Sequence, residues 1–265
     1  MLIDTHAHLY HAKFDGDRDE VVARARAAGV ERIVLPAIDV ASIHRALALC
    51  DRHDGVYAMA AIHPSDVKDA SDADLDAVEA WCADARVVAV GESGLDYYWD
   101  RSFDEKQRAF LRRHVRLAVE QDLPLILHTR DRGDGSEVCA DVLAILREER
   151  AAATRPERLR GIFHCYSGTP GVPEAARELG FLLGLGGTLT YKNGGVAEAV
   201  RDVPMEQIVL ETDAPFLAPV PHRGKRNEPA HVRLVAGRLA EVKGLSVEEV
   251  ERITTENALR LFKIS

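Results

Sequence analysis

Short apolar runs alternate with amphipathic stretches along the whole chain. Eight apolar runs predict buried strands, at 2–3, 32–35, 56–62, 87–90, 123–127, 161–163, 181–185 and 207–210. Between them, apolar residues recur every three or four positions and predict helices at 19–28, 40–50, 73–83, 102–121, 136–147, 173–179 and 195–201, with two more at 228–242 and 246–262. An apolar strand followed by a helix, repeated in this way, predicts an α/β fold with a parallel sheet.

The ends of several predicted helices carry signals of their own. Gly29 suits the end of the first helix, because glycine adopts the left-handed backbone conformation in which many helices stop. Ser102 and Glu105, like Ser246 and Glu249, have the spacing of a capping box, in which each side chain bonds to the backbone of the other residue. Both pairs therefore predict helix starts.

The number of strand and helix units within 265 residues matches a (β/α)8 TIM barrel better than an open doubly wound sheet. A Gly-rich phosphate loop after the first strand, which would favour a dinucleotide-binding fold, is absent from the sequence. No repeat or low-complexity linker divides the chain, so we predict a single domain over residues 1–265. Within it, the charged, Ala-rich segment 149–158 is expected to be a solvated connection.

Composition narrows the setting of the protein. Hydrophobic content of 46% and charged content of 29% are ordinary for a globular protein, no stretch is apolar enough to cross a membrane, and no signal-peptide pattern opens the chain. The four cysteines are widely spaced, which favours reduced thiols in a cytoplasmic protein. The net charge of -9 argues against a protein that coats duplex nucleic acid, but an enzyme that grips one strand end needs only bound metal ions and a few local basic residues.

Candidate metal ligands follow the predicted strands. His6 and His8 come after the first strand, and residues two apart on a strand point the same way, which suits a divalent cation such as Zn, Mn, Fe or Co. A chance pair of histidines capping a strand explains this pair equally well. Later strands are also followed by residues of ligand type: His63, Glu92, His128, His164 and Asp213. In a barrel all of them would reach the C-terminal face, where active sites lie, and could share two metal ions.

Each later candidate has a structural alternative. His63 could belong to a turn, Glu92 could cap the following loop, and His128 could be a hydrogen-bonded residue of the barrel. Asp213 could stabilise the turn that follows it. None of these alternatives accounts for the joint placement of the residues after successive strands.

The chain resembles the TatD-type metal-dependent deoxyribonucleases, a family of the amidohydrolase-type metal-dependent hydrolases. The resemblance rests on motifs in the family's order along nearly the whole chain: DTHAHL at 4–9, GESGLD at 91–96, HCYSG at 164–168, ETDAPFL at 211–217, RGKRNEP at 223–229 and NALRLF at 257–262. It implies two divalent metal ions, with His6, His8 and Asp213 on one, His128 and His164 on the other, and Glu92 bridging both. Many relatives in the wider superfamily place a carboxylated lysine at the bridge. Family members are usually described as Mg-dependent, whereas histidine ligands favour metals such as Mn or Zn.

The resemblance also implies an activity, the hydrolysis of phosphodiester bonds in DNA, as a 3′–5′ exonuclease on single-stranded ends with a role in DNA repair or turnover. Asp213 is the candidate for orienting the nucleophilic water or taking its proton. His63 is a candidate for contacting phosphate or supporting a ligand. Arg130 and Arg226 are candidates for gripping phosphate, because guanidinium fits phosphate at two points; a salt bridge is an equal alternative for each.

Several residues near the expected mouth bear on which substrate the protein prefers. The aromatic run 97–99 could stack on an unpaired base or form a hydrophobic lid over the barrel rim, and the lid is the preferred interpretation. Cys165 is interpreted as a packing residue. Ala61 stands where the family usually has Gly, and the loop 131–135 is longer and more polar than usual.

Two other classes of function remain open. A hydrolase of amides or esters on the same scaffold, such as a D-aminoacyl-tRNA deacylase, would use the same bridging hydroxide against a carbonyl. A non-enzymatic metal-binding or scaffold protein is disfavoured by the complete set of ligand candidates. Phosphate-binding side chains and stacking aromatics at the mouth would favour the nuclease, and a closed acyl pocket would favour the alternative hydrolase. The sequence does not fix the oligomeric state, and a monomer is favoured.

Overall fold

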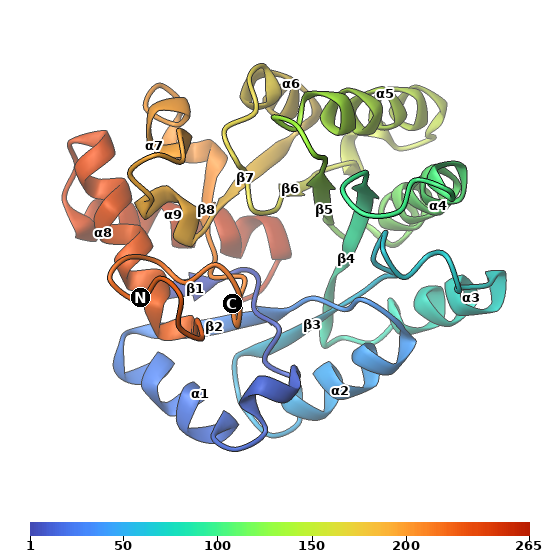
Figure 1. Cartoon of the computed structure of the whole chain (residues 1–265). Helices are drawn as coiled ribbons and strands as arrows, with labels where there is room; N and C mark the ends of the chain where they lie inside the picture. Colours follow the sequence, from blue (N-terminus) through green and yellow to red (C-terminus); the bar gives the residue numbers. More distant parts are fainter.

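The computed structural model describes residues 1–265 as a (β/α)8 barrel, shown in Figure 1. Eight parallel strands follow one another around the barrel in chain order. They are β1 (Leu2–Asp4), β2 (Val30–Leu35), β3 (Val56–Ala60), β4 (Val87–Asp96), β5 (Leu125–Arg130), β6 (Gly161–Phe163), β7 (Phe181–Leu185) and β8 (Ile208–Leu210). Because all the strands are parallel, their carboxyl ends open on one face of the barrel.

The helices surround the sheet (Figure 1). They are α1 (Arg18–Ala27), α2 (Val40–Cys50), α3 (Asp72–Trp81), α4 (Asp104–Gln121), α5 (Ser136–Ala152), α6 (Val172–Leu179), α7 (Val196–Ala199), α8 (Val232–Lys243) and α9 (Val247–Phe262). The predicted barrel and the order of its elements are confirmed, including the bounds of α2, β6 and β7. None of the helices is both long enough and apolar enough to cross a membrane.

The barrel closes between its first and last strands. The backbone N–H of Thr5 donates to the Leu210 carbonyl at 3.1 Å, and Ala7 forms an isolated parallel bridge with Ala214. The closure places the segments that follow β1 and β8 side by side, although they come from opposite ends of the chain. Candidate ligands near residues 6 and 213 are brought together in this way.

The opposite end of the barrel is filled with apolar side chains. Residues of the strands such as Ile3, Val34 and Met59 are buried with Leu261 and Phe262 of α9 in one hydrophobic cluster. Helix α9 is fixed there by hydrogen bonds from its polar side chains to backbone carbonyls at the start of β8 and at Met1. A polar site therefore has room only at the C-terminal mouth.

Two strands extend at their carboxyl ends by three or more residues beyond the predicted apolar runs. β4 and β5 continue past their apolar runs, so Glu92 and His128 lie within strands rather than after them. Gly94 permits the close pairing of these strands, because its φ is +146° and a Cβ atom there would lie 1.9 Å from the His128 carbonyl oxygen. The carboxyl-terminal halves of both strands lie at the mouth and carry polar residues. A search for apolar runs therefore ends each strand too early.

The two predicted capping boxes had different outcomes. Ser246 caps α9 as expected, since its hydroxyl accepts the N–H of Glu249 at 3.2 Å and its own N–H donates to the Glu249 carboxylate at 3.0 Å. The prediction at Ser102 was wrong, because α4 begins at Asp104 without a side-chain cap. The backbone N–H of Ser102 instead donates to Asp100 at 2.9 Å, a local turn that competes with capping.

The prediction of a solvated connection at 149–158 was also wrong over its first part. Helix α5 continues to Ala152, and the side chain of Glu149 is buried. Its carboxylate accepts hydrogen bonds from Arg116 at 2.7 and 2.9 Å and from Arg112 at 3.2 Å, both on α4. The charge in this segment therefore joins two helices.

Candidate metal centre

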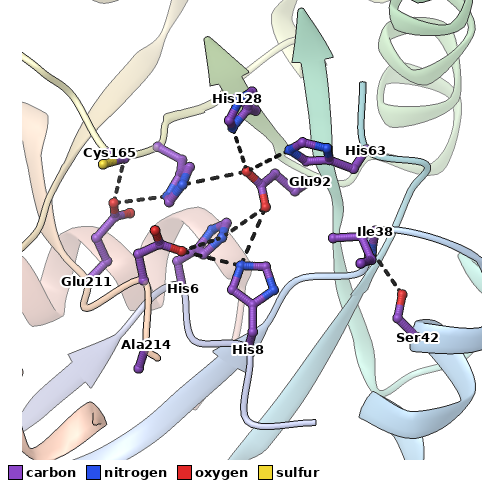
Figure 2. Close-up of polar contacts among 12 residues, drawn as sticks. His6, His8, Ile38, Ser42, His63, Glu92, His128, Cys165, Glu211 and Ala214 are labelled. Atoms are coloured by element: carbon purple, nitrogen blue, oxygen red, sulfur yellow. Dashed lines mark hydrogen bonds and ion pairs between the residues drawn. The ribbon is translucent and has the colours of Figure 1, made fainter. Parts of the chain in front are cut away.

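Histidine and carboxylate side chains converge at the C-terminal mouth around Glu92, as Figure 2 shows. His6 and His8 follow β1, Glu92 lies in β4, and His128 lies in β5. His164 follows β6 and Asp213 follows β8. The structure thus brings together all six residues that the resemblance assigns to metal. Both oxygens of the Glu92 carboxylate face imidazole rings, and they divide the cluster into two parts.

The first half-site comprises His6, His8 and Asp213 with the Oε2 atom of Glu92. The Nε2 atoms of His6 and His8 lie 3.2 and 3.6 Å from Oε2 of Glu92, and 3.8 and 3.3 Å from Oδ1 of Asp213. Donor atoms bound to one cation at the usual length of about 2.1 Å are roughly 3.0–3.5 Å apart. The observed spacings are close to that range.

The backbone around the first half-site is held by an unusual turn. Asp213 has a φ of +55°, in the left-handed region, and its N–H donates to the His6 carbonyl at 2.8 Å. Buried Asp4 joins the segments that follow β1 and β8. One of its carboxylate oxygens accepts the N–H groups of His6 at 3.2 Å and of Thr212 at 2.9 Å. The ligand-bearing residues after β1 and β8 are therefore joined through one carboxylate below them.

The second half-site comprises His128 and His164 with the Oε1 atom of Glu92. Nδ1 of His128 lies 2.9 Å from that oxygen and Nε2 of His164 lies 3.6 Å from it. Each ring also faces a second carboxylate with its other nitrogen: Asp96 lies 3.0 Å from His128 Nε2, and Glu211 lies 3.0 Å from His164 Nδ1. With a carboxylate beside its outer nitrogen, each ring would present the lone pair of its inner nitrogen to a cation bound at the centre.

Asp96 and Glu211 were not identified by sequence reasoning, although both lie inside the motifs that carry the family resemblance. The feature that could have identified them in the sequence is an acidic residue at the end of a buried strand. Glu211 fits its position closely, because a Cβ atom at Gly184 would lie 2.3 Å from one of its oxygens. Its other oxygen accepts the N–H of Cys165 at 2.6 Å as well as facing His164.

His63 contacts the centre differently from the other histidines. Its Nε2 atom lies 3.5 Å from Oε1 of Glu92, so distance alone would group it with the ligands. Its Nδ1 atom accepts the backbone N–H of Ser65 at 3.1 Å, which places the proton of the neutral ring on Nε2. His63 therefore presents an N–H donor to the centre, in line with its predicted role as a supporting or phosphate-contacting residue.

The burial and charge of the site fit a cation. Both ring nitrogens of fully buried His6 lack a hydrogen bond, although Nε2 is close to the Glu92 carboxylate. Burial alone would raise the pKa of Glu92, but electrostatic interaction with the surrounding imidazoles and the hydrogen bond with His128 hold that pKa well below its ordinary value. An ionised carboxylate among buried lone pairs that bond to nothing else is the arrangement that a divalent metal ion satisfies.

A cavity of about 1120 Å³ opens above the centre. Its wall includes the candidate phosphate-binding residue Arg130, the loop 131–135, and two exposed aromatic residues, Trp99 and Phe216. The loop is held by Asp131, whose carboxylate accepts two backbone N–H groups of its own loop. Cys165 also reaches the wall, so it is not solely a packing residue.

Two predicted mouth residues lie elsewhere. Arg226 does not line the cavity, because its guanidinium forms two hydrogen bonds of 2.6 Å with Asp17 and one of 2.7 Å with the Lys13 carbonyl. The ion-pair alternative is the observed one for this arginine. Tyr97 is buried, with its hydroxyl donating to Asp141 at 2.7 Å, and of the run 97–99 only Trp99 lines the cavity.

Comparison with known proteins agrees with this geometry. The sequence model of the family described as TatD related DNase matches residues 3–263. YabD of Bacillus subtilis (strain 168), an uncharacterized metal-dependent hydrolase, is 43% identical over 266 residues, covering 100% of both proteins. The chain belongs to the TatD family of metal-dependent hydrolases. YcfH of Escherichia coli (strain K12), another uncharacterized metal-dependent hydrolase, is 36% identical over 268 residues, covering 100% of this chain and 96% of the relative.

A solved structure of the TatD family has the same fold throughout. YjjV, a TatD homologue from Escherichia coli K12, superposes with a TM-score of 0.90 at 30% identity, covering 100% of this chain and 98% of the other. The expected family and barrel are therefore confirmed. The buried His and Glu clusters at the mouth are the part of the TatD barrel suited to metal-dependent hydrolysis.

Proposed function

We propose that this TatD-family hydrolase is a two-metal deoxyribonuclease that removes nucleotides from the 3′ end of single-stranded DNA, in DNA repair or turnover. The observation that carries the proposal is the position of Glu92, whose two oxygens each face a different set of imidazoles. One carboxylate between two donor sets suits a pair of cations, such as Mg, Mn or Zn ions, that share a bridging ligand. The family description as a DNase supplies the substrate class.

The proposed ligands are His6, His8 and Asp213 in the first half-site and His128 and His164 in the second, with Glu92 common to both. Divalent cations held there would make a bound water acidic enough to lose a proton near neutral pH and would offset charge on the phosphoryl oxygens. Burial would raise the pKa of Asp213, but the hydrogen bond from His8 and the charges of the neighbouring imidazoles lower it. Its ionised carboxylate can orient the attacking water and accept its proton.

Substrate contacts in this proposal come from the wall of the cavity. The Nε2–H of His63 faces the centre and can donate to a phosphate oxygen. Arg130 lines the cavity without a carboxylate partner, so its guanidinium is free for two-point contact with phosphate. Arg226 is left out of the proposed substrate site, because Asp17 already occupies its two-point face.

The shape of the mouth favours a polymer over a small acyl group. Its volume of about 1120 Å³ exceeds the range of ~300–1,000 Å³ that is common for small-molecule pockets. A free arginine and exposed aromatic rings line it, whereas an acyl pocket would be closed and uncharged. These features support phosphodiester hydrolysis over amide or ester hydrolysis.

The test is cleavage of an end-labelled single-stranded oligonucleotide by the metal-stripped protein after addition of Mg or Mn. We expect metal-dependent shortening from the 3′ end, and a loss of about 10³-fold in rate for Glu92→Ala, because both half-sites lose their common ligand. The matched control is Glu79→Ala, the same substitution at an exposed position on α3. An intact oligonucleotide under every metal would refute the nuclease, and hydrolysis of an aminoacyl ester instead would support the alternative hydrolase.

A further inference from the structure

Two exposed aromatic rings stand on opposite walls of the cavity. Trp99, in the loop after β4, is 63% exposed, and Phe216, in the loop after β8, is 41% exposed; both line the cavity. β4 and β8 are half the circumference apart in a barrel whose eight strands follow in order. The metal centre therefore lies between the two rings.

Two arginines contact the segment that carries Trp99. Arg132 donates to the carbonyl oxygens of Tyr98 at 2.8 Å and Trp99 at 3.3 Å. The guanidinium of Arg130 lies 4.0 Å from the ring centre of Tyr98 and 5.4 Å from that of Trp99. Arg132 thus anchors the backbone of Trp99, and Arg130 lies beside its ring. A large apolar ring that is positioned in this way and still exposed to the cavity is prepared to receive a flat partner.

Phe216 is held in a similar way on the other wall. Its N–H donates to the carbonyl of Asp213 at 2.8 Å, so the turn that positions the proposed ligand also positions the ring. The rings of His8 and His11 meet it edge-on, with centres 5.8 and 5.6 Å away. The ammonium group of Lys13 lies 5.4 Å from the ring centre.

Each ring is thus accompanied by a cation without a carboxylate partner, Arg130 beside Trp99 and Lys13 beside Phe216. Ion pairs engage many of the other arginines of this acidic chain, including Arg24, Arg86 and Arg116. An exposed aromatic ring next to a free cation is the combination that single-stranded nucleic acid uses, with the base on the ring and the phosphate on the cation.

We propose that Trp99 and Phe216 are stacking platforms for the two nucleotides on either side of the scissile phosphate, with Arg130 and Lys13 binding the adjoining phosphates. This inference rests on the proposed nuclease function and adds a determinant of specificity to it. Bases within a duplex are stacked on each other and cannot reach the rings. The two platforms therefore select unpaired ends.

Fluorescence tests the Trp99 platform directly. The chain has two tryptophans, and the other, Trp81 on α3, packs against His44 with ring centres 4.9 Å apart, outside the cavity. The metal-loaded Trp81→Phe protein therefore reports on Trp99 alone. In stopped-flow mixing with excess thymidine hexanucleotide, we expect at least a twofold quench. An abasic oligonucleotide of equal length should leave the signal unchanged; equal signals with both oligonucleotides would overturn the platform.

Kinetics test both platforms and separate them from the proposed function. For Trp99→Ala and Phe216→Ala we expect KM for the hexanucleotide to rise about tenfold, with kcat nearly unchanged, because base–aromatic stacking contributes to binding of each nucleotide. Trp99→Phe should recover most of the loss. Exposed Val220, which does not line the cavity, provides the control Val220→Ala.

The abasic substrate separates stacking from general loss of binding. Wild type and both alanine variants should cleave it with the same KM. If wild type cleaves DNA and the alanine variants keep the wild-type KM for the thymidine hexanucleotide, the platforms are refuted while the nuclease stands. If wild type neither cleaves the hexanucleotide nor shows the quench, both proposals fail.

Discussion

The two half-sites of the candidate metal centre obtain their negative charge in different ways. In the first, the carboxylate of Asp213 directly faces His6 and His8. In the second, the carboxylates of Asp96 and Glu211 lie behind the rings of His128 and His164, on the nitrogens that point away from Glu92. In the first half-site the negative charge faces the candidate ligand nitrogens directly. In the second it lies on the opposite side of each imidazole ring.

The orientation of the rings differs accordingly. Nδ1 of His8 meets only the neutral hydroxyl of Tyr10, at 2.9 Å, and His6 is fixed by stacking on His164 with ring centres 3.6 Å apart. In the second half-site the outer carboxylates act together with Glu92 against burial: Asp96 and Glu92 raise the pKa of His128 to about 9, and Glu211 and Glu92 raise the pKa of His164 to about 10. The first half-site thus depends on a direct ligand, and the second on the groups behind its ligands.

The strongest test of this difference removes the direct charge. In Asp213→Asn the side chain keeps its size and tolerates the left-handed backbone, but it cannot act as an anionic ligand or accept a proton as readily. We expect kcat on single-stranded DNA to fall about 10³-fold. Calorimetric titration with Mn should show one weakened site and one unchanged site.

Two results would contradict the assignment for Asp213. A rate within a few-fold of wild type would remove this carboxylate from the reaction. Loss of both metal sites together would mean that the half-sites are not separate, and the division at Glu92 would then be wrong.

A smaller effect is expected when the outer charge of the second half-site is removed. Glu211→Gln preserves the shape that Gly184 accommodates and can still accept the N–H of Cys165, but it loses the charge behind His164. Outer carboxylates of this kind are worth about 10–100-fold in metal affinity. We expect the second site to weaken by that factor while the first keeps its affinity, as measured by the same titration.

The melting temperature provides the control for Glu211→Gln. A loss of metal affinity accompanied by a large fall in melting temperature of the metal-free protein would indicate a structural role instead. Unchanged affinity at both sites would show that the outer carboxylate does not tune its ligand.

The residues that converge at the candidate metal centre could be predicted from the sequence more completely than the groups behind them. His6, His8 and His164 stand out because they follow strands whose apolar runs are easy to recognise. Glu92 and His128 were placed one element too late, since polar residues inside a strand look like the start of a loop. Even so, the barrel topology was enough to put them at the correct end of the molecule.

Contacts between distant segments could not be predicted from one sequence. The sequence around Arg226 does not indicate that its guanidinium pairs with Asp17, which is 209 positions away in the chain. Likewise, Glu211 has no local pattern that pairs it with His164, and Glu149 has none that pairs it with α4. Each of these depends on the exact packing of neighbouring units around the barrel, which periodicity does not contain.

Glu149 tests whether the effect of an outer carboxylate depends on its partner. Like Glu211 it is a buried acid behind cationic groups, but its partners are Arg112 and Arg116, far from the centre. Glu149→Gln should therefore leave both metal affinities and the rate unchanged. It should lower the free energy of unfolding by about 2 kcal/mol at pH 7, because hydrogen bonds to a charged group are lost.

The pH dependence of that loss has a definite sign. Burial would raise the pKa of Glu149, but Arg116 and Arg112 hold it below the ordinary value of 4.5. A carboxylate with a lowered pKa stabilises the fold above its unfolded-state pKa, and that contribution disappears as the pH falls through the folded-state value. The difference in unfolding free energy between wild type and Glu149→Gln should be full at pH 7 and shrink below about pH 4.5, as followed by denaturant titration. A constant difference down to pH 3 would mean that the charge of Glu149 is not what joins α4 to α5.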